Sequence, residues 1–306
     1  MRRFILAAVA GLFLCQHLVS PRAELADTDQ PPRVISLDWG LTSTLLALGA
    51  AVPAIAEKKS YADWVGDGQA PATAVDLGLR LAPDMERLRE LQPDLILITP
   101  QFSSIEPRLN LVAKTRSFAT FTPDRTPLAN ATEITRQLGQ MLHLDHNAVQ
   151  LIAQSTAALD ALRETATPAQ KACEFLMVNF VDDTHVRVFG NGSLYGDVLK
   201  AAGIRNAWTR PTNFWGYGTA SLNALLRQPE AGLLIVGPVP LDVQRQLQPD
   251  RSLGASDTLL DRLPAVQAGR YRVLPAIWSF GGLPEATALA KALMAADLPE
   301  CDHEKS

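Results

Sequence analysis

The sequence predicts an α/β protein of two lobes, each with a mainly parallel sheet, joined by one long helix. Short apolar runs, of the kind buried in parallel sheets, alternate with amphipathic segments along most of the 306 residues, which is typical of sheets covered by helices. Between the two series, His146 to Thr165 contains no Gly or Pro. At about 1.5 Å per residue this segment spans roughly 30 Å, the width of a small domain. We therefore predict lobes at 33–144 and 168–300 and a connecting helix at 145–167, with one more surface helix as the alternative.

Composition narrows the classes of function. The chain is 47% apolar and 20% charged, with a formal net charge of −4, so it has enough apolar residues for two domains of ordinary size. Its basic residues form no visible patch, and we therefore expect no nucleic acid as a partner.

Residues 1–26 have the pattern of a signal peptide. Arg2 and Arg3 precede an apolar core of eleven residues, Phe4–Leu14, which is too short to span a bilayer. The bulky residues before Cys15 argue against a lipid anchor, so simple secretion is favoured. We expect the mature protein in the periplasm.

The first lobe reads as strands and helices in alternation. The expected elements are a strand at 33–39, a helix at 39–48, a strand at 51–56, a loop at 58–73, a helix between Pro83 and Pro93, a buried strand at 95–99, a helix at 109–114, a strand at 117–122 and an amphipathic helix at 127–142.

One arginine of this lobe stands on a loop. Arg80 belongs to a short Gly-containing turn before the helix that follows Pro83. A long cationic side chain on such a turn is free to reach a ligand, although a surface ion pair is the ordinary role of a loop arginine. Ligands of parallel α/β lobes collect outside the carboxyl ends of the strands. Arg80 and Phe102 both lie on loops that can reach this edge.

The second lobe repeats the alternation. We expect strands at 173–180, 185–190, 232–237 and 269–274, and helices within 190–203, at 218–228, 259–262 and 283–296. Cys173 opens the first of these strands and Cys301 follows the last helix. In an oxidising compartment a disulfide between them and two free thiols are about equally expected.

A glycine-rich run and the histidines suggest two further chemistries. Gly190–Gly196 mimics a dinucleotide-binding fingerprint, but the spacing is off by one and no acidic residue ends a following strand at the expected distance. A tight strand-to-helix turn is favoured, and an extracytoplasmic nucleotide-using enzyme is the minor alternative. His143, His146 and His185 do not have the spacing of a metal site. No catalytic residues and no protein-ligated metal are predicted.

Aromatic residues concentrate at or beyond the ends of the predicted elements. Rings beside Gly on loops often form the flat walls of a ligand site, although each alone is as compatible with a core position. Together with Arg80 they favour a pocket. They are Trp39, Trp64, Phe102, Trp215, Tyr217, Trp278 and Phe280.

Several motifs across residues 33–298 carry a family resemblance. They are RVISLDW with LLALG, the Tyr61–Trp64 loop, VDLGLR, QPDLILI, VFGNGSLYGDVL, GIRNAW, TNFWGYGTASL and AGRYRVLPAIW. The chain resembles the periplasmic binding proteins of iron(III)-hydroxamate siderophore import, within the helical-backbone (class III) substrate-binding proteins of ABC importers. That class also serves cobalamin, haem and other siderophores, which stay open as alternative ligands.

The resemblance implies a shallow ligand cleft between the lobes and assigns residues to it. Arg80 matches the arginine that contacts the hydroxamate oxygens, and Trp215 matches an aromatic that packs against the ligand. Asn213, Trp64 and Trp278 match further cleft positions. Iron arrives already chelated in the siderophore, so no cofactor is implied.

The chain also departs from the family pattern. Phe102 and Phe280 stand where the family has hydrogen-bonding tyrosines, and Tyr217 or Tyr61 are candidates to replace those phenols. The resemblance further implies a monomer that docks on a membrane permease through exposed carboxylates. Glu106 and Glu230 are our candidates for docking, with an ordinary solvated surface as the alternative for each.

Overall fold

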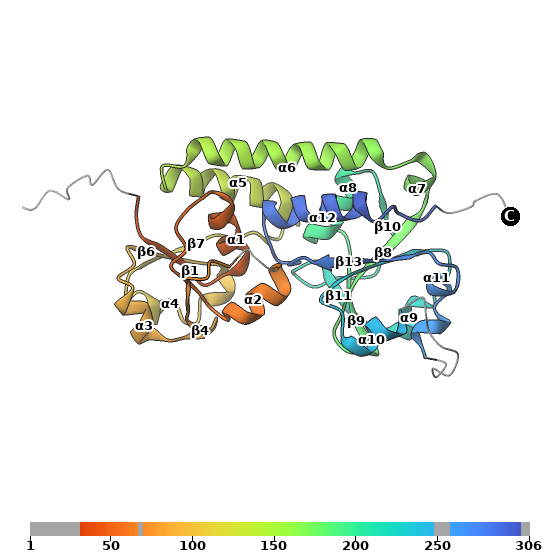
Figure 1. The fold of residues 1–306 in the computed structure, drawn as a ribbon, viewed down its shortest axis with the longest axis horizontal. Coiled ribbons are helices and arrows are strands. Elements are labelled where there is room, and N and C mark those ends of the chain that lie inside the picture. Colours follow the sequence, from red (N-terminus) through yellow and green to blue (C-terminus); the bar gives the residue numbers. More distant parts are fainter. Residues whose placement is uncertain (1–30, 67–69, 248–257, 301–306) are drawn as a thin grey trace, which may run out of the picture. The chain divides into compact units, whose positions relative to one another are not determined.

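The computed structural model describes residues 31–66, 70–247 and 258–300 (Figure 1). The predicted signal peptide and Cys301 lie outside these ranges. The described residues from Pro32 onward belong to one compact unit. Its strands form two main sheets, and the α/β prediction is confirmed.

The first sheet is parallel throughout, in the order β1 (Val34–Ser36), β6 (Leu95–Ile98) and β7 (Lys114–Ser117). Two small strand pairs stand beside it. One joins β2 (Ala54–Ile55) to β3 (Val75–Asp76) in parallel, and the other joins β4 (Gly78–Leu79) to β5 (Ala82–Pro83) as a hairpin. Arg80 lies in the turn of that hairpin. The helices of this half are α1 (Trp39–Ala47), α2 (Lys58–Val65), α3 (Met85–Glu90), the 3-10 turn η1 (Pro100–Phe102), α4 (Glu106–Leu109) and α5 (Pro127–Met141).

Four expectations for residues 33–144 were wrong in detail. The expected loop at 58–73 contains helix α2. Helix α3 begins after Asp84 rather than at Pro83, because the Asp84 carboxylate accepts hydrogen bonds from the N–H groups of Glu86 and Arg87. The expected helix at 109–114 and strand at 117–122 are instead α4 and β7. Asn110 ends this helix early, since its side-chain oxygen accepts from Thr115 N–H at the start of β7.

The long helix α6 covers Asp145–Thr165. It ends two residues before the predicted limit because Thr167 caps the next helix, α7 (Pro168–Ala172), through a capping box with Gln170. In Figure 1, α6 runs alongside α5, α12 (Leu283–Ala295) and α8 (Leu194–Ala201), and it packs on all three. The division into two lobes at 33–144 and 168–300 stays a prediction.

The second sheet is mixed. Its strands follow the order β11 (Tyr217–Ser221), β9 (His185–Phe189), β8 (Glu174–Phe180), β12 (Gly232–Gly237) and β13 (Tyr271–Ala276), with β10 (Arg205–Asn206) paired to β8. Among the described strands, β8, β10, β12 and β13 pair in parallel, whereas β9 pairs antiparallel with β8 and β11. The remaining short helices are α9 (Leu222–Leu225), α10 (Leu241–Gln246), η2 (Leu260–Arg262) and α11 (Pro264–Gln267). The prediction of a helix at 218–228 was wrong for its first residues, because Tyr217–Ser221 forms strand β11, which pairs antiparallel with β9.

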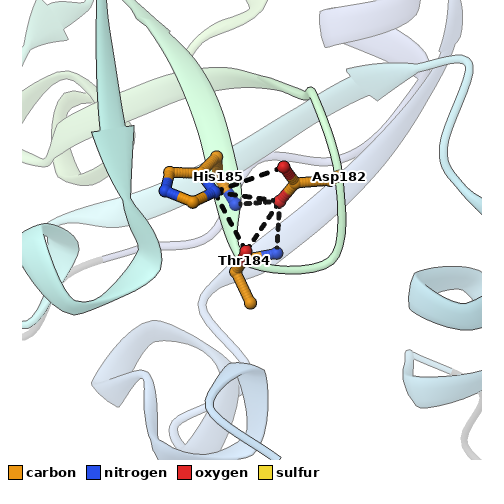
Figure 2. A network of polar contacts seen from close by, with 3 residues as sticks. All are labelled: Asp182, Thr184 and His185. Atoms are coloured by element: carbon orange, nitrogen blue, oxygen red, sulfur yellow. Dashed lines mark hydrogen bonds and ion pairs between the residues drawn. The ribbon is translucent and has the colours of Figure 1, made fainter.

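The turn between β8 and β9 is closed by Asp182 (Figure 2). Its carboxylate accepts hydrogen bonds from Thr184 N–H and His185 N–H at 2.8 and 2.7 Å. These bonds, with the Thr184 hydroxyl, lower the pKa of Asp182 to about 2. The ring of His185 faces the same carboxylate, with Nδ1 3.1 Å from Oδ1. This histidine therefore takes part in a turn.

The last helix links parts of the chain that the sequence analysis assigned to different lobes. Helix α12 packs against α1 and α5 of the first half as well as α6 and α8. Gly40 in α1 has no room for a side chain, because a Cβ there would lie 2.8 Å from the Phe280 carbonyl oxygen. The segment between β13 and α12, which carries Trp278 and Phe280, is thereby held against α1.

Candidate functional site

A pocket of about 330 Å³ opens at the carboxyl edge of the first sheet. Each of the three parallel strands of the first sheet is followed by residues that line this pocket. Ligands of such sheets collect at this carboxyl edge. Loops of the second half complete the opposite side. The lining residues are Asp38 after β1, Thr99, Pro100 and Gln101 after β6, Thr120 and Phe121 after β7, Phe214 and Trp215 before β11, and Phe280 before α12.

The polar part of the pocket centres on Asp38. One oxygen of this carboxylate caps α1 by accepting from Leu41 N–H at 3.1 Å. The other accepts long hydrogen bonds from the Thr99 hydroxyl at 3.4 Å and the Gln101 amide at 3.3 Å. Burial raises the pKa of Asp38, and the nearby Arg80 cation is among the groups that act against this rise. Among the described residues, the pocket lining is therefore mostly apolar, with one carboxylate and the uncharged polar side chains of Thr99, Gln101 and Thr120.

The apolar part of the pocket is a group of packed rings. Trp215 stacks on Tyr217 with ring centroids 6.4 Å apart and an interplanar angle of 23°. Phe280 lies at the centre of the group, with its ring centroid 5.8 Å from Tyr217, 6.4 Å from Trp215 and 6.0 Å from Phe121. Trp215 keeps 37% of its surface exposed. This aromatic wall can cover an apolar ligand segment without fixing its shape.

Asn213 holds the loop that carries this wall. Its side-chain oxygen accepts from the N–H groups of Trp215 and Tyr217 at 3.0 and 3.3 Å. Its backbone N–H donates to the Tyr217 carbonyl, and its own carbonyl accepts from Gly216 N–H. In this structure the predicted ligand-binding residue Asn213 organises the turn.

Arg80 does not line the pocket, but its charge acts on the carboxylate of Asp38, which does. Its Nε donates to the Glu57 carboxylate at 3.0 Å, and its backbone N–H donates to the same carboxylate at 3.2 Å. The guanidinium carbon lies 3.9 Å from the Trp39 ring centroid and 5.6 Å from that of Trp278. Within the described ranges, Glu57 is the one hydrogen-bond partner of this guanidinium, so its two terminal NH₂ groups remain available to a ligand.

The tryptophans around Arg80 form one connected cluster. The ring of Trp278 lies 4.8 Å from Trp39 and 5.8 Å from Trp64. It also lies 5.1 Å from Phe280, which joins the cluster to the pocket wall. The structure thus brings Arg80, Trp64, Trp215, Tyr217, Trp278 and Phe280 into one continuous group.

Three of the aromatic predictions require correction. Trp278 is 8% exposed, so it packs against Arg80 and Phe280 and offers little surface to a ligand. Phe102 is 1% exposed and packs among the aliphatic side chains of the first sheet, because the turn at Pro100–Phe102 directs its ring inward while Pro100 and Gln101 line the pocket. Tyr61, a candidate replacement phenol, is fully buried against Trp39.

Sequence reasoning missed several lining residues. Phe121 and Phe214 were not proposed as ligand-binding residues, although Phe214 lies in the TNFWG motif. Asp38, Thr99 and Gln101 were missed as well. Their common signal is the position just after a parallel strand.

The glycine-rich run forms the expected tight turn before α8. The Ser193 hydroxyl donates to the Gly190 carbonyl at 2.7 Å and accepts from Gly196 N–H at 2.9 Å, which caps the helix. A second, more polar hollow of about 630 Å³ lies over this turn, beside Arg125, Asp197 and Lys200. In the described part of the chain, no three His, Cys, Asp or Glu residues gather as a metal site would need, and no described helix is long and apolar enough to cross a membrane.

The remaining predicted residues occupy separate places. Glu106 begins α4 and accepts a hydrogen bond from the Thr115 hydroxyl at 2.7 Å. Glu230 is exposed in the turn before β12. Cys173 is disulfide-bonded, and its sulfur lies 3.6 Å from the Pro299 carbonyl oxygen, while its predicted partner Cys301 is outside the described residues.

Comparisons with known proteins identify the family and the fold. A family model described as "Periplasmic binding protein" matches residues 34–277. The iron(3+)-hydroxamate-binding protein FhuD of Escherichia coli is 28% identical over 292 residues, which cover 95% of each chain.

Solved structures with the same fold include proteins for different siderophores. The siderophore-binding protein FhuD of Vibrio cholerae, with Fe³⁺-Desferal bound, matches with a TM-score of 0.79 and 24% identity over 87% of this chain and 98% of that one. The catecholate-siderophore binding protein VctP of Vibrio cholerae matches with a TM-score of 0.65 and 18% identity over 87% of this chain and 94% of that one.

Proposed function

Because this chain belongs to the periplasmic binding protein family, which its match over residues 34–277 shows, we propose that it captures a ferric hydroxamate siderophore and delivers it to an ABC importer. The relative that matches over nearly the whole chain binds iron(3+) hydroxamates. In this proposal the iron arrives chelated, the protein acts as a carrier without catalysis, and the chain works as a monomer outside the cytoplasm.

The observation that carries the proposal is the pairing of Arg80 with the aromatic wall. Glu57 and the Trp39 ring hold the guanidinium through its Nε and one face. The two free NH₂ groups can donate to electron-rich hydroxamate oxygens around the iron. The rings of Phe121, Trp215 and Phe280 then cover the apolar linker of the siderophore.

The charge of the site favours hydroxamates over catecholates. Three hydroxamates neutralise a ferric ion, whereas three catecholates leave a complex with three negative charges. Among the described residues, the pocket lining contains the Asp38 carboxylate and no Lys or Arg, and Arg80 is the cation whose charge acts on Asp38. A ferric tris-catecholate with three negative charges would be repelled by the buried Asp38 carboxylate. The single Arg80 cation would not offset this repulsion at short range.

Tryptophan fluorescence tests the proposal. Trp215 lines the pocket, Trp39 and Trp278 lie against the Arg80 guanidinium, and Trp64 packs on Trp278, so a bound ferric complex should quench emission. We expect saturable quenching by ferrichrome or ferrioxamine B, and none by cobalamin, haem or a ferric tris-catecholate at the same concentrations. Equal quenching by the catecholate complex would contradict the charge argument. No response to any hydroxamate complex would reject the proposed ligand class.

Delivery to a permease is the second part of the proposal. Glu106 and Glu230 are the candidate docking carboxylates. Charge reversal at both positions should reduce uptake of the ferric complex by intact cells without changing its affinity for the purified protein. Unchanged uptake in the double variant would remove these residues from the account. The Cys173–Cys301 disulfide is likewise proposed, and mass spectrometry of an unreduced tryptic digest tests it.

A further inference from the structure

The loop that carries Phe214 and Trp215 is bonded to an arginine from the other half of the chain. Arg125 lies between β7 and α5. One terminal nitrogen donates to the Thr212 hydroxyl at 2.8 Å. The other reaches the carbonyl oxygens of Thr212 and Asn213, each at 3.3 Å. One side chain thus bonds three acceptors that lie 87 or 88 residues away in the sequence.

These acceptors belong to the turn that sets the direction of the aromatic wall. Asn213, whose carbonyl accepts from Arg125, is the residue whose side chain binds the N–H groups of Trp215 and Tyr217. A guanidinium is a planar, forked donor, so it can bind two carbonyl oxygens and a hydroxyl at once, which an ammonium group does less well. Arg125 therefore holds the outer side of the turn while Asn213 closes its inner side.

The glycine-rich turn is shaped to accept this arginine. Gly192 has a φ of +85°, and a Cβ there would lie 2.8 Å from the Arg125 Cβ. Gly216, in the aromatic loop, has a φ of +80°, and a Cβ there would lie 2.4 Å from Ser193 N. The Gly216 carbonyl also accepts from Gly190 N–H at 2.9 Å. The 122–126, 190–193 and 212–217 segments thus meet without room for a side chain on either glycine.

The same segments connect the two sides of the pocket. Phe121 lines the pocket four residues before Arg125, and Phe214 and Trp215 line it just after Asn213. Nearby, the Asp197 carboxylate of α8 accepts from Leu128 N–H at the start of α5 at 3.1 Å. The described contacts therefore join the first-half loop to the second half at two neighbouring points.

We propose that Arg125 is a positioning residue for the ligand site: its direct hydrogen bonds to Thr212 and Asn213 order the Thr212–Tyr217 loop, so that Phe214 and Trp215 form a preformed wall. The effect on affinity rests on the proposed function, but the ordering of the loop does not. A wall ordered before binding lowers the entropy lost on binding and slows dissociation. Arg125 is exposed, so its bonds should matter more for this loop than for global stability.

The test compares Arg125→Ala with Arg136→Ala in the full chain. Arg136 is another exposed arginine, on α5, paired with Glu133 one helical turn away, so its loss serves as the matched control. In the unliganded protein, amide hydrogen exchange at residues 213–217 should be about tenfold faster in Arg125→Ala than in the control. Ferrioxamine B should bind Arg125→Ala about tenfold more weakly, mainly through faster dissociation.

Two further variants separate ordering from general damage. Thr212→Val removes one acceptor without touching Arg125, and it should accelerate exchange at 213–217 by a smaller factor. Arg125→Lys keeps the positive charge but loses the forked guanidinium. Its exchange rate at residues 213–217 should therefore be closer to that of Arg125→Ala than to that of the wild type. If a lower thermal midpoint accompanies the alanine variant, Thr212→Val still decides whether the bonds order the loop.

Two outcomes would overturn the inference. One is an amide hydrogen-exchange rate at residues 213–217 that equals the wild-type rate in both Arg125→Ala and Thr212→Val. The other is faster exchange with unchanged affinity and dissociation rate, which would leave Arg125 without influence on the site. If the wild-type protein fails to bind any ferric hydroxamate, the proposed function falls, and the exchange measurement still tests the ordering role.

Discussion

The rings of Trp278 and Phe280 lie 5.1 Å apart and nearly perpendicular, at 80°. This contact joins the cluster around Arg80 to the wall of the pocket. Trp278 packs in the core of the first half with Trp39, although it follows the last strand of the second sheet. The segment between β13 and α12 therefore supplies both the support beneath Arg80 and the central ring of the wall. Five substitutions, each with a control or a matched comparison, test the site and the core that supports it.

Arg80→Ala should weaken binding of a ferric hydroxamate by roughly tenfold to a hundredfold, since hydrogen bonds from a charged donor contribute about 1.5–3 kcal/mol. The side chain is 24% exposed and its bond to Glu57 is near the surface, so the thermal midpoint should change little. Isothermal titration and thermal unfolding measure the two effects. Arg87→Ala, on the exposed side of α3, is the control and should bind normally. Unaltered affinity in the Arg80 variant would mean that its free NH₂ groups do not reach the ligand.

Trp215→Ala should also weaken binding by roughly tenfold or more, because aromatic rings that wall a site often dominate its affinity. Trp215 is partly exposed, so its loss should cost the fold about 0.5–1 kcal/mol at most. Leu241→Ala removes a more exposed apolar side chain, on α10, and provides the control for general surface effects. The same titrations apply, with absorbance or calorimetry in place of fluorescence for this variant. Wild-type affinity after removal of Trp215 would exclude its ring from the ligand contact.

Phe102→Ala should mainly reduce stability, whereas Phe121→Ala should mainly reduce ligand affinity. Phe102 is buried in the core, so its truncation should reduce the free energy of unfolding by about 3–5 kcal/mol. Phe121 lines the pocket and is only partly buried, so its truncation should reduce affinity more than stability. Denaturant unfolding and ligand titration of both variants measure the contrast. A Phe102 variant that keeps its stability but loses affinity would place that ring in the site after all.

Glu285→Gln should change how stability depends on pH. Burial raises the pKa of Glu285 from its ordinary 4.5 to about 7, so between these values the folded state binds the proton more tightly than the unfolded state does. Stability from this group is therefore full below about pH 4.5 and is lost as pH rises to about 7, by about 3 kcal/mol. The neighbouring Asp38 carboxylate contributes to the raised pKa.

Thermal unfolding from pH 5 to pH 8 measures this effect. The wild type should lose more stability than Glu285→Gln over this range, and Glu133→Gln, an exposed change on α5, should follow the wild type. Parallel curves for the wild type and Glu285→Gln would show that the buried carboxyl does not titrate in this range.

Much of the fold was predictable because strands and helices have local signals. The helix α6 followed from an uninterrupted run without Gly or Pro, and its end was missed by two residues only because the Thr167 capping box was overlooked. The buried strand β6 followed from a continuous apolar run. The local pattern of β11 predicts a helix, because the pairing of this strand with β9 is a long-range contact that no local pattern contains.

The sequence predicted most of the loops that form the candidate site, but not which of their side chains face the pocket. Arg80 beside a glycine, and Trp215 and Phe280 in aromatic loops, carried enough local signal to be chosen, and the structure brings them together. The same reasoning also chose Phe102, whose ring turns inward, and missed Phe121. A position on a loop does not specify whether a ring packs into the core or faces a ligand.

By itself, the sequence determined most of the strands and helices and the aromatic loops, and it placed a cation on a turn near the expected edge of a sheet. The tertiary structure alone decided that Trp278 is buried against Arg80, that Phe121 and Trp215 line the same pocket, and that Arg125 bonds a loop 87 residues away. The physical reason is that periodicity and turn chemistry act between near neighbours in the chain. Burial and ring packing depend on which distant segments meet.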